Sequence, residues 1–264
     1  MRSHRIPYKR TAPQQALGNL TQQPAKICGL EIMESEVLKK RLSNIKERIK
    51  NTAIDCGRDP DTVHLVAVSK TMPEDIVREA INAGVDILGE NYIQEARDKI
   101  NALSSHRVLW HFIGHLQSNK AKYVVKLFDM IHTVDSLKLA HELNKQAKKI
   151  NKIQKILIQV NISMESTKSG IYEEDAQKLI KEISLFENLS IKGLMTMPPF
   201  FNNPEKVRPC FSALRNLRDK IRNEAIKNVN MQELSMGMTG DFEVAIKEGA
   251  TFVRIGTAIF GERN

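Results

Sequence analysis

A lysine that directly follows a short apolar segment is the residue in this sequence best suited to covalent chemistry. Residues 65–68 are all apolar, Ser69 follows them, and Lys70 comes next. An ammonium group withdrawn from water tends to lose its proton or to acquire a partner, because burial penalises the charged form. The neutral amine is the form that condenses with an aldehyde to a Schiff base. The alternative is that Lys70 turns its side chain out to solvent at the end of a strand.

Two segments near the C-terminus have the composition of a phosphate site. Arg254-Ile-Gly-Thr257 offers a cation, a residue without bulk and a hydroxyl group, and Ser235-Met-Gly-Met238 precedes it in the chain. Phosphate binding requires backbone N–H donors and little side-chain bulk, and it often uses a positive charge. Turns use the same residues, so the place of these segments in the fold decides how they are interpreted.

His111 and His115 are four positions apart in the sequence and lie on either side of Gly114. This spacing would suit two metal ligands on a helix, but the segment has the pattern of a strand followed by a loop. No third ligand stands at a suitable spacing. We therefore expect no metal site and assign both histidines to hydrogen bonds at the rim of the fold.

Eight short apolar segments alternate with helical segments after residue 64, and this alternation predicts the fold. The predicted strands are residues 65–69, 87–90, 109–114, 130–134, 156–161, 191–197, 233–237 and 252–256. Strands that alternate with helices pair in parallel through crossover connections. Eight such units in about 200 residues predict an α/β fold of the (β/α)8 TIM-barrel type. An open doubly wound sheet is the alternative, but it would need a glycine-rich turn after an early strand, and none follows residues 65–69.

Helical segments are expected between these strands, near residues 74–83, 91–103, 117–128, 136–150, 173–187, 205–227 and 240–248. Thr71 and Glu74 have the spacing of a capping box for the first of them. A further helix is expected over residues 34–54, where Leu38, Leu42 and Ile45 begin an apolar stripe.

Residues 1–32 differ in composition from the rest of the chain. They contain three prolines and no helical or strand periodicity. We expect a basic, disordered extension over residues 1–32 and a single barrel domain over residues 33–264. A translation start at Met33 is an alternative, and a targeting peptide fits less well because the segment has no apolar core.

The net charge of +9 raises the question of nucleic acid. Residues 1–32 hold five Lys or Arg and one Glu, so +4 of this charge belongs to that segment. No basic run is interleaved with aromatic residues, and we expect a solvated surface, with neither nucleic acid nor membrane as a partner. The three cysteines lie far apart, which argues against a disulfide framework or a zinc site and favours the cytoplasm.

In TIM barrels the functional face is built from the C-terminal ends of the strands, and phosphate often binds after strands seven and eight. Lys70 follows the first predicted strand, and the segments at 235–238 and 254–257 follow the seventh and eighth. The fold would therefore bring the amine and the phosphate loops to one face.

The chain resembles the pyridoxal phosphate homeostasis proteins, also called the YggS or PROSC family. The matching segments run in order from residue 34 to the C-terminus: Val66-Ala-Val-Ser-Lys-Thr71, Gly89-Glu-Asn-Tyr-Ile-Gln-Glu95, Trp110-His-Phe-Ile-Gly-His-Leu-Gln-Ser-Asn-Lys120, His132-Thr-Val-Asp135, Gln159-Val-Asn161, Lys168-Ser-Gly170, Gly193-Leu-Met-Thr-Met-Pro198, Leu234-Ser-Met-Gly-Met238 and Val253-Arg-Ile-Gly-Thr-Ala-Ile-Phe-Gly261. No single segment is diagnostic, but the ordered set is specific.

The resemblance implies the barrel of the alanine racemase N-terminal domain, with pyridoxal 5′-phosphate (PLP) bound as a Schiff base to Lys70. It implies a cofactor-binding set in which Asn91 and Met197 lie near the ring, and Ser235, Arg254, Gly256 and Thr257 lie near the phosphate. That set is Lys70, Asn91, Met197, Ser235, Met236, Arg254, Gly256 and Thr257. Lys168 matches a second lysine of the family, and we treat it as a possible secondary cofactor site.

Racemisation at an amino-acid α-carbon needs a base on each face of the cofactor. A racemase of this type takes its second base, a tyrosine, from an additional β domain, whereas this barrel is expected to end near Ala258. We therefore expect a protein without catalytic residues that buffers PLP or delivers it to PLP-dependent apoenzymes, and that is monomeric. A racemase or lyase that uses Tyr92 or His115 is the first alternative, and a basic nucleic-acid-associated protein is the second.

Overall fold

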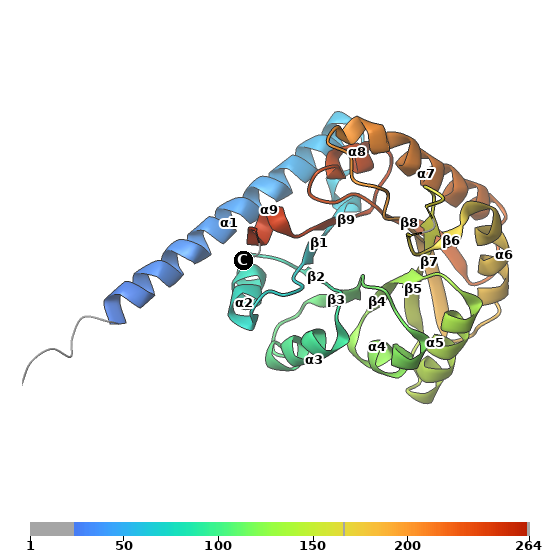
Figure 1. Ribbon diagram of the computed structural model, residues 1–264, viewed down its shortest axis with the longest axis horizontal. Coiled ribbons are helices and arrows are strands. Elements are labelled where there is room, and N and C mark those ends of the chain that lie inside the picture. The colour runs from blue at the N-terminus through green and yellow to red at the C-terminus, as the bar shows by residue number, and fades with distance from the viewer. Residues whose placement is uncertain (1–23, 166, 263–264) are drawn as a thin grey trace, which may run out of the picture.

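Eight parallel strands close into a barrel in the computed structural model, which describes residues 24–165 and 167–262. The barrel strands are β1 (His64–Val68), β2 (Ile87–Glu90), β3 (Leu109–Phe112), β4 (Met130–Val134), β5 (Gln154–Asn161), β7 (Leu189–Met195), β8 (Val229–Ser235) and β9 (Phe252–Ile255). They follow one another around the ring in chain order, and pairing of β1 with β9 closes it. Each predicted strand is found, and the predicted (β/α)8 barrel is confirmed (Figure 1).

A short additional strand, β6 (Ile171–Tyr172), pairs in parallel with Val160 and Asn161 at the C-terminal end of β5. This strand was not predicted from the sequence, because a strand of two residues has no detectable periodicity. It anchors the loop that follows β5 to the functional face of the barrel.

Helices cover the outside of the barrel, close to the positions predicted from the sequence. They are α1 (Pro24–Asp55), α2 (Glu74–Asn82), α3 (Ile93–Ala102), α4 (Ala121–Leu127), α5 (Leu137–Lys149), α6 (Glu173–Ile183), α7 (Arg208–Asn223), α8 (Phe242–Lys247) and α9 (Thr257–Phe260). Three 3₁₀ turns accompany them: η1 (Pro60–Thr62), η2 (Ser118–Lys120) and η3 (Pro204–Val207).

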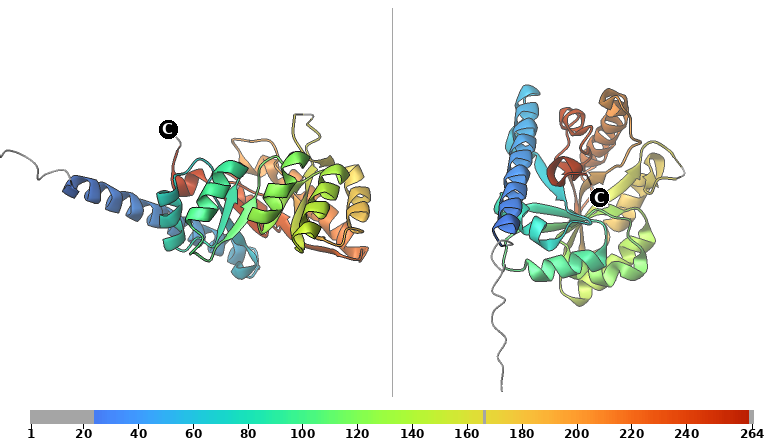
Figure 2. Two further views of the ribbon diagram at one scale, coloured as in Figure 1. Left: turned by 90° about the horizontal axis from the view of Figure 1, so that it is seen from below. Right: turned by 60° about the vertical axis from the view of Figure 1, so that its left-hand side comes forward.

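The long helix α1 fills the gap in the helical ring that the single turn of α9 leaves after the last strand. It contacts α2, α8 and α9 and lies along one side of the barrel (Figure 2). Its stripe of Leu38, Leu42, Ile45 and Ile49 is buried, as the apolar pattern predicts. The C-terminal part of α1 therefore completes the outer layer of the fold.

α1 begins at Pro24, ten residues before the predicted start at residue 34. The apolar pattern marks only the part of the helix that packs on the barrel, so it gave no sign of the preceding turns. Residues 24–32 are helical where we expected disorder, and residues 1–23 lie outside the described part of the chain. The domain boundary at residue 33 stays a prediction.

Strand side chains alternate between two cores. Those that point outward pack under the helices in one large apolar cluster. Those that point inward form a small cluster in the centre of the barrel: Val66, Ile87, Met130, Leu157, Met195 and Phe252. Polar side chains occupy the next inward positions of several strands, and they form the floor of the candidate site.

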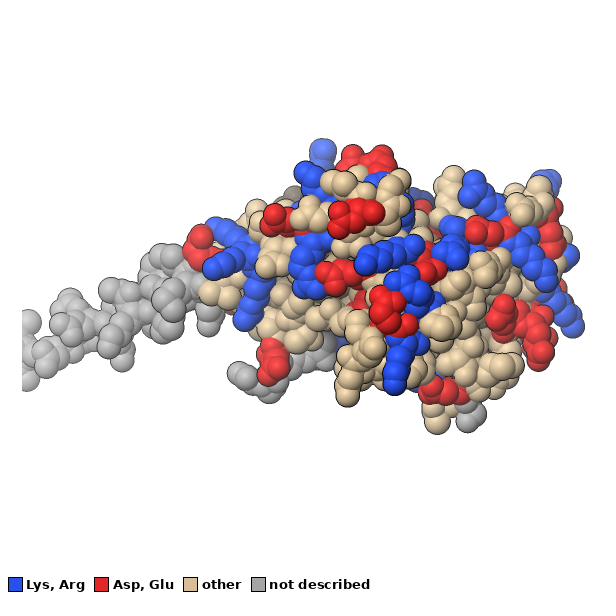
Figure 3. Space-filling view, turned by 90° about the horizontal axis from the view of Figure 1, so that it is seen from above, with Lys and Arg blue, Asp and Glu red and all other residues tan. Residues whose placement is uncertain are grey.

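Charged residues of both signs are interspersed over the face of the molecule shown in Figure 3. Basic side chains on that face lie next to acidic ones instead of gathering in one patch. Within the described residues, no helix is both long and apolar enough to cross a membrane.

Candidate cofactor-binding site

Lys70 stands in a tight turn between β1 and α2. Ser69 is buried and donates its N–H to the Gly89 carbonyl of β2, whereas Lys70 is half-buried. Thr71 adopts a left-handed backbone with φ of 65°, which is costly for a β-branched residue. Its hydroxyl donates to the Lys70 carbonyl at 2.6 Å. The predicted capping box is therefore wrong: Pro73 precedes α2 without a side-chain cap, and the Thr71 hydroxyl bonds within the lysine turn instead.

A buried ion-pair cluster holds this turn from beneath. The Lys99 ammonium on α3 donates to the Ser69 carbonyl at 2.6 Å, to Glu90 Oε1 at 2.8 Å and to Glu95 Oε1 at 2.6 Å. The same Glu95 oxygen accepts the Thr71 N–H at 2.5 Å. All three ammonium hydrogens are thus used. Lys99 ties α3 to Ser69, and Glu95 ties it to Thr71, on the two sides of Lys70.

Glu90 is the acidic centre of this cluster and is fully buried at the end of β2. Its Oε1 also accepts the Ser69 hydroxyl at 2.7 Å. Burial raises the pKa of Glu90, and the hydrogen bond and charge of Lys99 oppose that rise. Lys99 was not identified from the sequence; the signal for it was the i, i+4 spacing of Glu95 and Lys99 on one helix.

Arg254 lies on β9, the strand that pairs with β1, and is 4% exposed. Its guanidinium donates to the Ser235 hydroxyl of β8 at 2.6 Å and to the Thr196 carbonyl at 2.9 Å. Burial lowers the pKa of Arg254 to about 10, partly offset by Asp241, so the side chain stays charged at neutral pH. The structure thus brings together Ser235 and Arg254, as predicted, at the floor of the site.

Two buried histidines extend this contact through the barrel. His132 Nδ1 of β4 lies 2.9 Å from Ser235 Oγ, and His132 Nε2 lies 3.0 Å from His111 Nδ1 of β3. Burial lowers the pKa of His111 to about 3, with smaller effects from Lys155 and His64. Burial, then His111 and Arg254, lower the pKa of His132 as well. Burial therefore favours the neutral form of both rings.

The predicted position of His111 at the rim is wrong, because its side chain points into the barrel. His115 does lie at the rim and is exposed, with Nδ1 3.4 Å from Ser169 Oγ. The two histidines therefore point to different environments. No group of three or more His, Cys, Asp or Glu among the described residues could hold a metal ion.

Glycines let the two predicted phosphate loops approach neighbouring elements. Gly237 has φ of 89°, and a Cβ there would lie 2.6 Å from the Ala245 Cβ on α8. A Cβ on Gly256 would lie 3.3 Å from the Val68 carbonyl, so the loop after β9 passes directly beside the end of β1. Thr257 is exposed at the start of α9. Gly256 and Thr257 therefore lie next to the strand that leads to Lys70.

The loop after β8 is closed by Asp241, whose Oδ1 accepts the Met238 N–H at 2.6 Å. Burial raises the pKa of Asp241, and the Met238 N–H and the charge of Arg254 oppose that rise. The Arg254 N–H bonds the Gly237 carbonyl at 3.0 Å and joins the two loops.

The other predicted cofactor-binding residues, Asn91, Met197 and Met236, lie in different surroundings. Asn91 follows β2, and its Oδ1 is buried without a hydrogen-bond partner among the described residues. Met197 follows β7 and is 40% exposed. Met236 is fully buried in the core between sheet and helices, and its N–H bonds the Phe252 carbonyl. We therefore assign Met236 to packing and give its side chain no contact with a ligand.

Lys168 is half-buried in the loop between β5 and β6, on the same face as the other strand ends. The Asn161 amide at the end of β5 donates to the Glu165 carbonyl at 2.8 Å and to the Lys168 carbonyl at 3.3 Å. Gly170, with φ of 124°, lets the loop return against Asn161. The backbone around Lys168 is thus held to the barrel.

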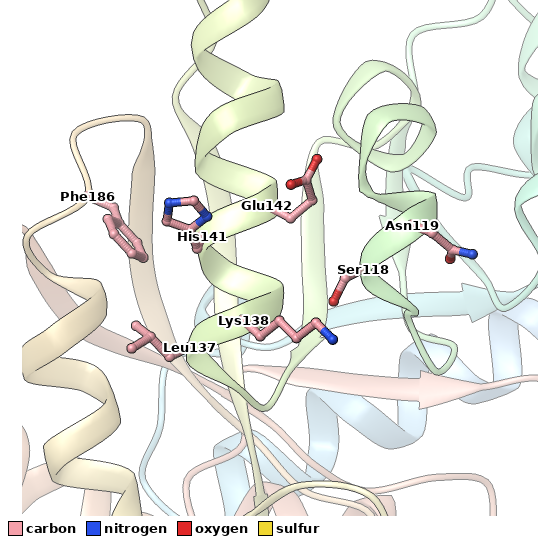
Figure 4. Close-up of a pocket in the computed structure, with 7 residues that line it drawn as sticks. All are labelled: Ser118, Asn119, Leu137, Lys138, His141, Glu142 and Phe186. Carbon is pink, nitrogen blue, oxygen red and sulfur yellow. The ribbon is translucent and has the colours of Figure 1, made fainter.

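Two surface hollows lie near this face. One, of about 260 Å³, is lined by ten residues that include Asn91, Tyr92, His115 and Lys120. The other, of about 590 Å³, lies between η2 and α5, where His141 and Phe186 stand side by side (Figure 4). Asn91 is the one member of the predicted cofactor set that lines either of them within the described chain.

Comparison with known proteins identifies the family. Residues 41–264 match the family described as alanine racemase, N-terminal domain. The pyridoxal phosphate homeostasis protein of Aquifex aeolicus is 46% identical over 223 residues, which cover 84% of this chain and 97% of that protein. The protein of the same name from Escherichia coli K12 is 41% identical over 84% of this chain and 95% of its own length.

Solved structures agree with this relationship. PipY of Synechococcus elongatus, determined with PLP bound, is 32% identical, has a TM-score of 0.74 and covers 85% of this chain and 100% of its own. An alanine racemase of Clostridium difficile 630 is 17% identical with a TM-score of 0.65, covers 86% of this chain and 57% of its own, and shares the fold. The chain therefore belongs to the family of pyridoxal phosphate homeostasis proteins, built on the barrel of the alanine racemase N-terminal domain.

Proposed function

We propose that this protein binds PLP as a Schiff base on Lys70 and acts in PLP and amino-acid homeostasis by buffering the cofactor or delivering it. The observation that carries the proposal is the lysine turn: a half-buried lysine at the end of β1, with the backbone on both sides fixed by Lys99 and Glu95. Such a turn presents one amine in a defined place on the functional face. The PLP-bound relative supports the choice of ligand.

The residues present suit the chemical groups of PLP. The Lys70 amine adds to the aldehyde carbon and water leaves, so a C=N bond replaces the C=O bond. Gly256 and Thr257 begin a turn beside β1 and offer backbone N–H groups and a hydroxyl to the phosphate. The buried Asn91 oxygen, which has no partner among the residues that the structure describes, suits a donor on the ligand, and Arg254 supplies a fixed positive charge.

A carrier is favoured over an enzyme because the candidate second bases are poorly held. Tyr92 is 58% exposed, and His115 is exposed, with Nδ1 3.4 Å from Ser169 Oγ. A general base has to be positioned within hydrogen-bond reach of the proton that it removes. PLP held on Lys70 would pass to an incoming amine by imine exchange, which returns the free lysine amine, and this exchange is all that a carrier requires.

Further parts of the proposal concern the surroundings of the protein. We infer that the recipients are PLP-dependent apoenzymes, that the protein works as a cytoplasmic monomer, and that Lys168 serves as a secondary cofactor contact. Neither nucleic acid nor a membrane has a part in this function.

The direct test is an absorbance titration of the full chain with PLP. Wild-type protein should develop a Schiff-base band, Lys70→Ala should not, and Lys39→Ala, an exposed lysine of α1, should keep it as the matched lysine control. Incubation with common amino acids in D₂O should give negligible exchange of the α-proton. Rapid exchange with any one amino acid would favour the racemase or lyase, and a band that survives in Lys70→Ala would contradict the proposed attachment.

A further inference from the structure

The barrel interior holds a continuous series of four hydrogen-bonded side chains, and two of them, His132 and His111, have no part in the proposed function as stated above. It runs from Arg254 through Ser235 and His132 to His111, with successive distances of 2.6, 2.9 and 3.0 Å. All four residues are at most 4% exposed. Two neutral histidines bonded ring to ring inside a barrel are unusual enough to need an explanation, because apolar packing would fill the same space.

The donor and the acceptor in each of these hydrogen bonds follow from the number of hydrogens that each side chain carries. A guanidinium has only donors, so Arg254 donates to Ser235 Oγ. The Ser235 hydroxyl then has one hydrogen of its own, and His132 Nδ1 is its one available acceptor among the described residues. A neutral ring that accepts at Nδ1 carries its hydrogen on Nε2. His132 Nε2–H therefore donates to His111 Nδ1, and His111 carries its hydrogen on Nε2 as well.

The reverse direction leaves a buried group without a partner. If His132 donated from Nδ1, Ser235 Oγ would accept two hydrogen bonds and its own hydrogen would point at no acceptor in the described interior. A buried donor without an acceptor is disfavoured. A positively charged His132 is disfavoured too, since burial, His111 and Arg254 all lower its pKa.

This arrangement fixes Arg254 at two points. One guanidinium nitrogen is bound to Ser235, whose orientation is set by His132, and another is bound to the Thr196 carbonyl. The rings of His132 and His111 are in turn held against Phe252, with centroid distances of 5.5 and 5.4 Å. The Arg254 guanidinium therefore cannot rotate without breaking its hydrogen bonds to Ser235 and Thr196.

We propose that His132 is a positioning residue: as a neutral ring with its hydrogen on Nε2, it orients Ser235 and thereby fixes Arg254 for PLP binding. The proposal rests on the proposed function for its ligand, whereas the hydrogen positions are a property of the protein alone. His111 completes the arrangement by accepting from His132.

Nitrogen-15 NMR of the histidine rings in the full chain at pH 7 tests the hydrogen positions without any ligand. His111→Asn and His132→Asn spectra would assign the two rings by the loss of their signals. We expect both rings to be neutral, with the hydrogen on Nε2. A hydrogen on Nδ1 of His132, or a cationic ring, would overturn the proposal whatever PLP does.

Substitutions test the effect on the cofactor. His132→Leu removes the acceptor for Ser235 and should weaken PLP binding about tenfold or more, which corresponds to about 1.4 kcal/mol. His132→Asn keeps an oxygen near the place of Nδ1 and should restore affinity to within about threefold of wild type. Leu143→Ala, in the outer core on α5, is the control for a general loss of stability and should leave PLP affinity unchanged.

Three results would contradict the positioning role: wild-type affinity in His132→Leu, no recovery in His132→Asn, or an equal loss in Leu143→Ala. The NMR measurement decides the question if His132→Leu does not fold. If wild-type protein forms no Schiff base on Lys70, the proposed function fails, while the hydrogen positions can still be found as inferred.

Discussion

Removing the Lys99 ammonium should destabilise the barrel strongly, because it would leave a buried carboxylate without its counter-charge. Lys99→Met retains most of the side-chain volume and deletes three hydrogen bonds, those to Ser69, Glu90 and Glu95. Glu90 is fully buried, and its Oε2 already has no partner within the described chain. Breaking a buried ion pair from one side typically costs about 3–5 kcal/mol. For a domain of this size that corresponds to a fall in Tm of about 6–20 °C.

The loss should depend on pH in a defined direction. Burial already raises the pKa of Glu90 above its ordinary value, and loss of Lys99 removes the charge that opposes this rise. The folded variant then binds a proton that the unfolded chain has released, so its stability falls as pH rises through the raised pKa. The difference from wild type should be largest at neutral and alkaline pH. It should shrink towards about pH 4, where Glu90 is protonated in both states.

Urea unfolding followed by circular dichroism measures this effect. Lys99→Met combined with Glu90→Gln should recover much of the loss, since no buried charge remains. Lys39→Met is the control, because Lys39 forms an exposed pair with Glu36 and should change stability by less than about 1 kcal/mol. The reasoning would be refuted if Lys99→Met were as stable as Lys39→Met, or if the loss were the same at pH 4 and pH 8.

Three other substitutions test the site and its support. Gly193→Ala should prevent stable folding, because its Cβ would overlap the Glu233 carbonyl on β8, whereas Gly240→Ala meets nothing nearer than 3.8 Å and should fold normally; thermal unfolding distinguishes them. Arg254→Ala should lower PLP retention during gel filtration by about tenfold while circular dichroism stays that of a barrel, and Arg48→Ala, an exposed arginine, should retain PLP fully. Thr71→Gly should relieve the left-handed strain and raise stability by up to about 1 kcal/mol, and a destabilised variant would show that the Thr71 hydroxyl outweighs the strain.

The strand pattern of this chain was readable from sequence because each strand is a short apolar run between turn residues. The eight predicted strands are all present, and Lys70, Ser235, Arg254, Gly256 and Thr257 all lie at or beside strand ends of one face. These five residues lie on one face because the C-terminal ends of parallel strands meet at the same side of a barrel. The strand ends were the least accurate part: β8 begins at Val229 and not at residue 233, because its first residues are partly exposed and do not form an apolar run.

The interior of the site could not be foreseen in the same way. His111 was assigned to the rim, although side chains of a strand alternate between its two faces. On β4, His132 stands two residues after the inward-facing Met130 and so faces inward too. His111 lies on the neighbouring strand β3, where it pairs with Met130. That alternation was the available signal, but it does not say that two inward-facing histidines on neighbouring strands lie within hydrogen-bond distance. Lys99 is similar: its spacing from Glu95 was visible, whereas its contact with the Ser69 carbonyl depends on how α3 packs.

The attachment of PLP to Lys70 is the central claim, and borohydride trapping followed by peptide mass mapping tests it most directly. Reduction of the PLP-loaded full chain turns a Schiff base into a stable secondary amine, so the modified lysine can be identified by mass. We predict a single major modified peptide containing Lys70, with Lys99 unmodified because its ammonium is buried and fully hydrogen-bonded. Modification chiefly at another lysine, with the Lys70 peptide unlabelled, would contradict the account.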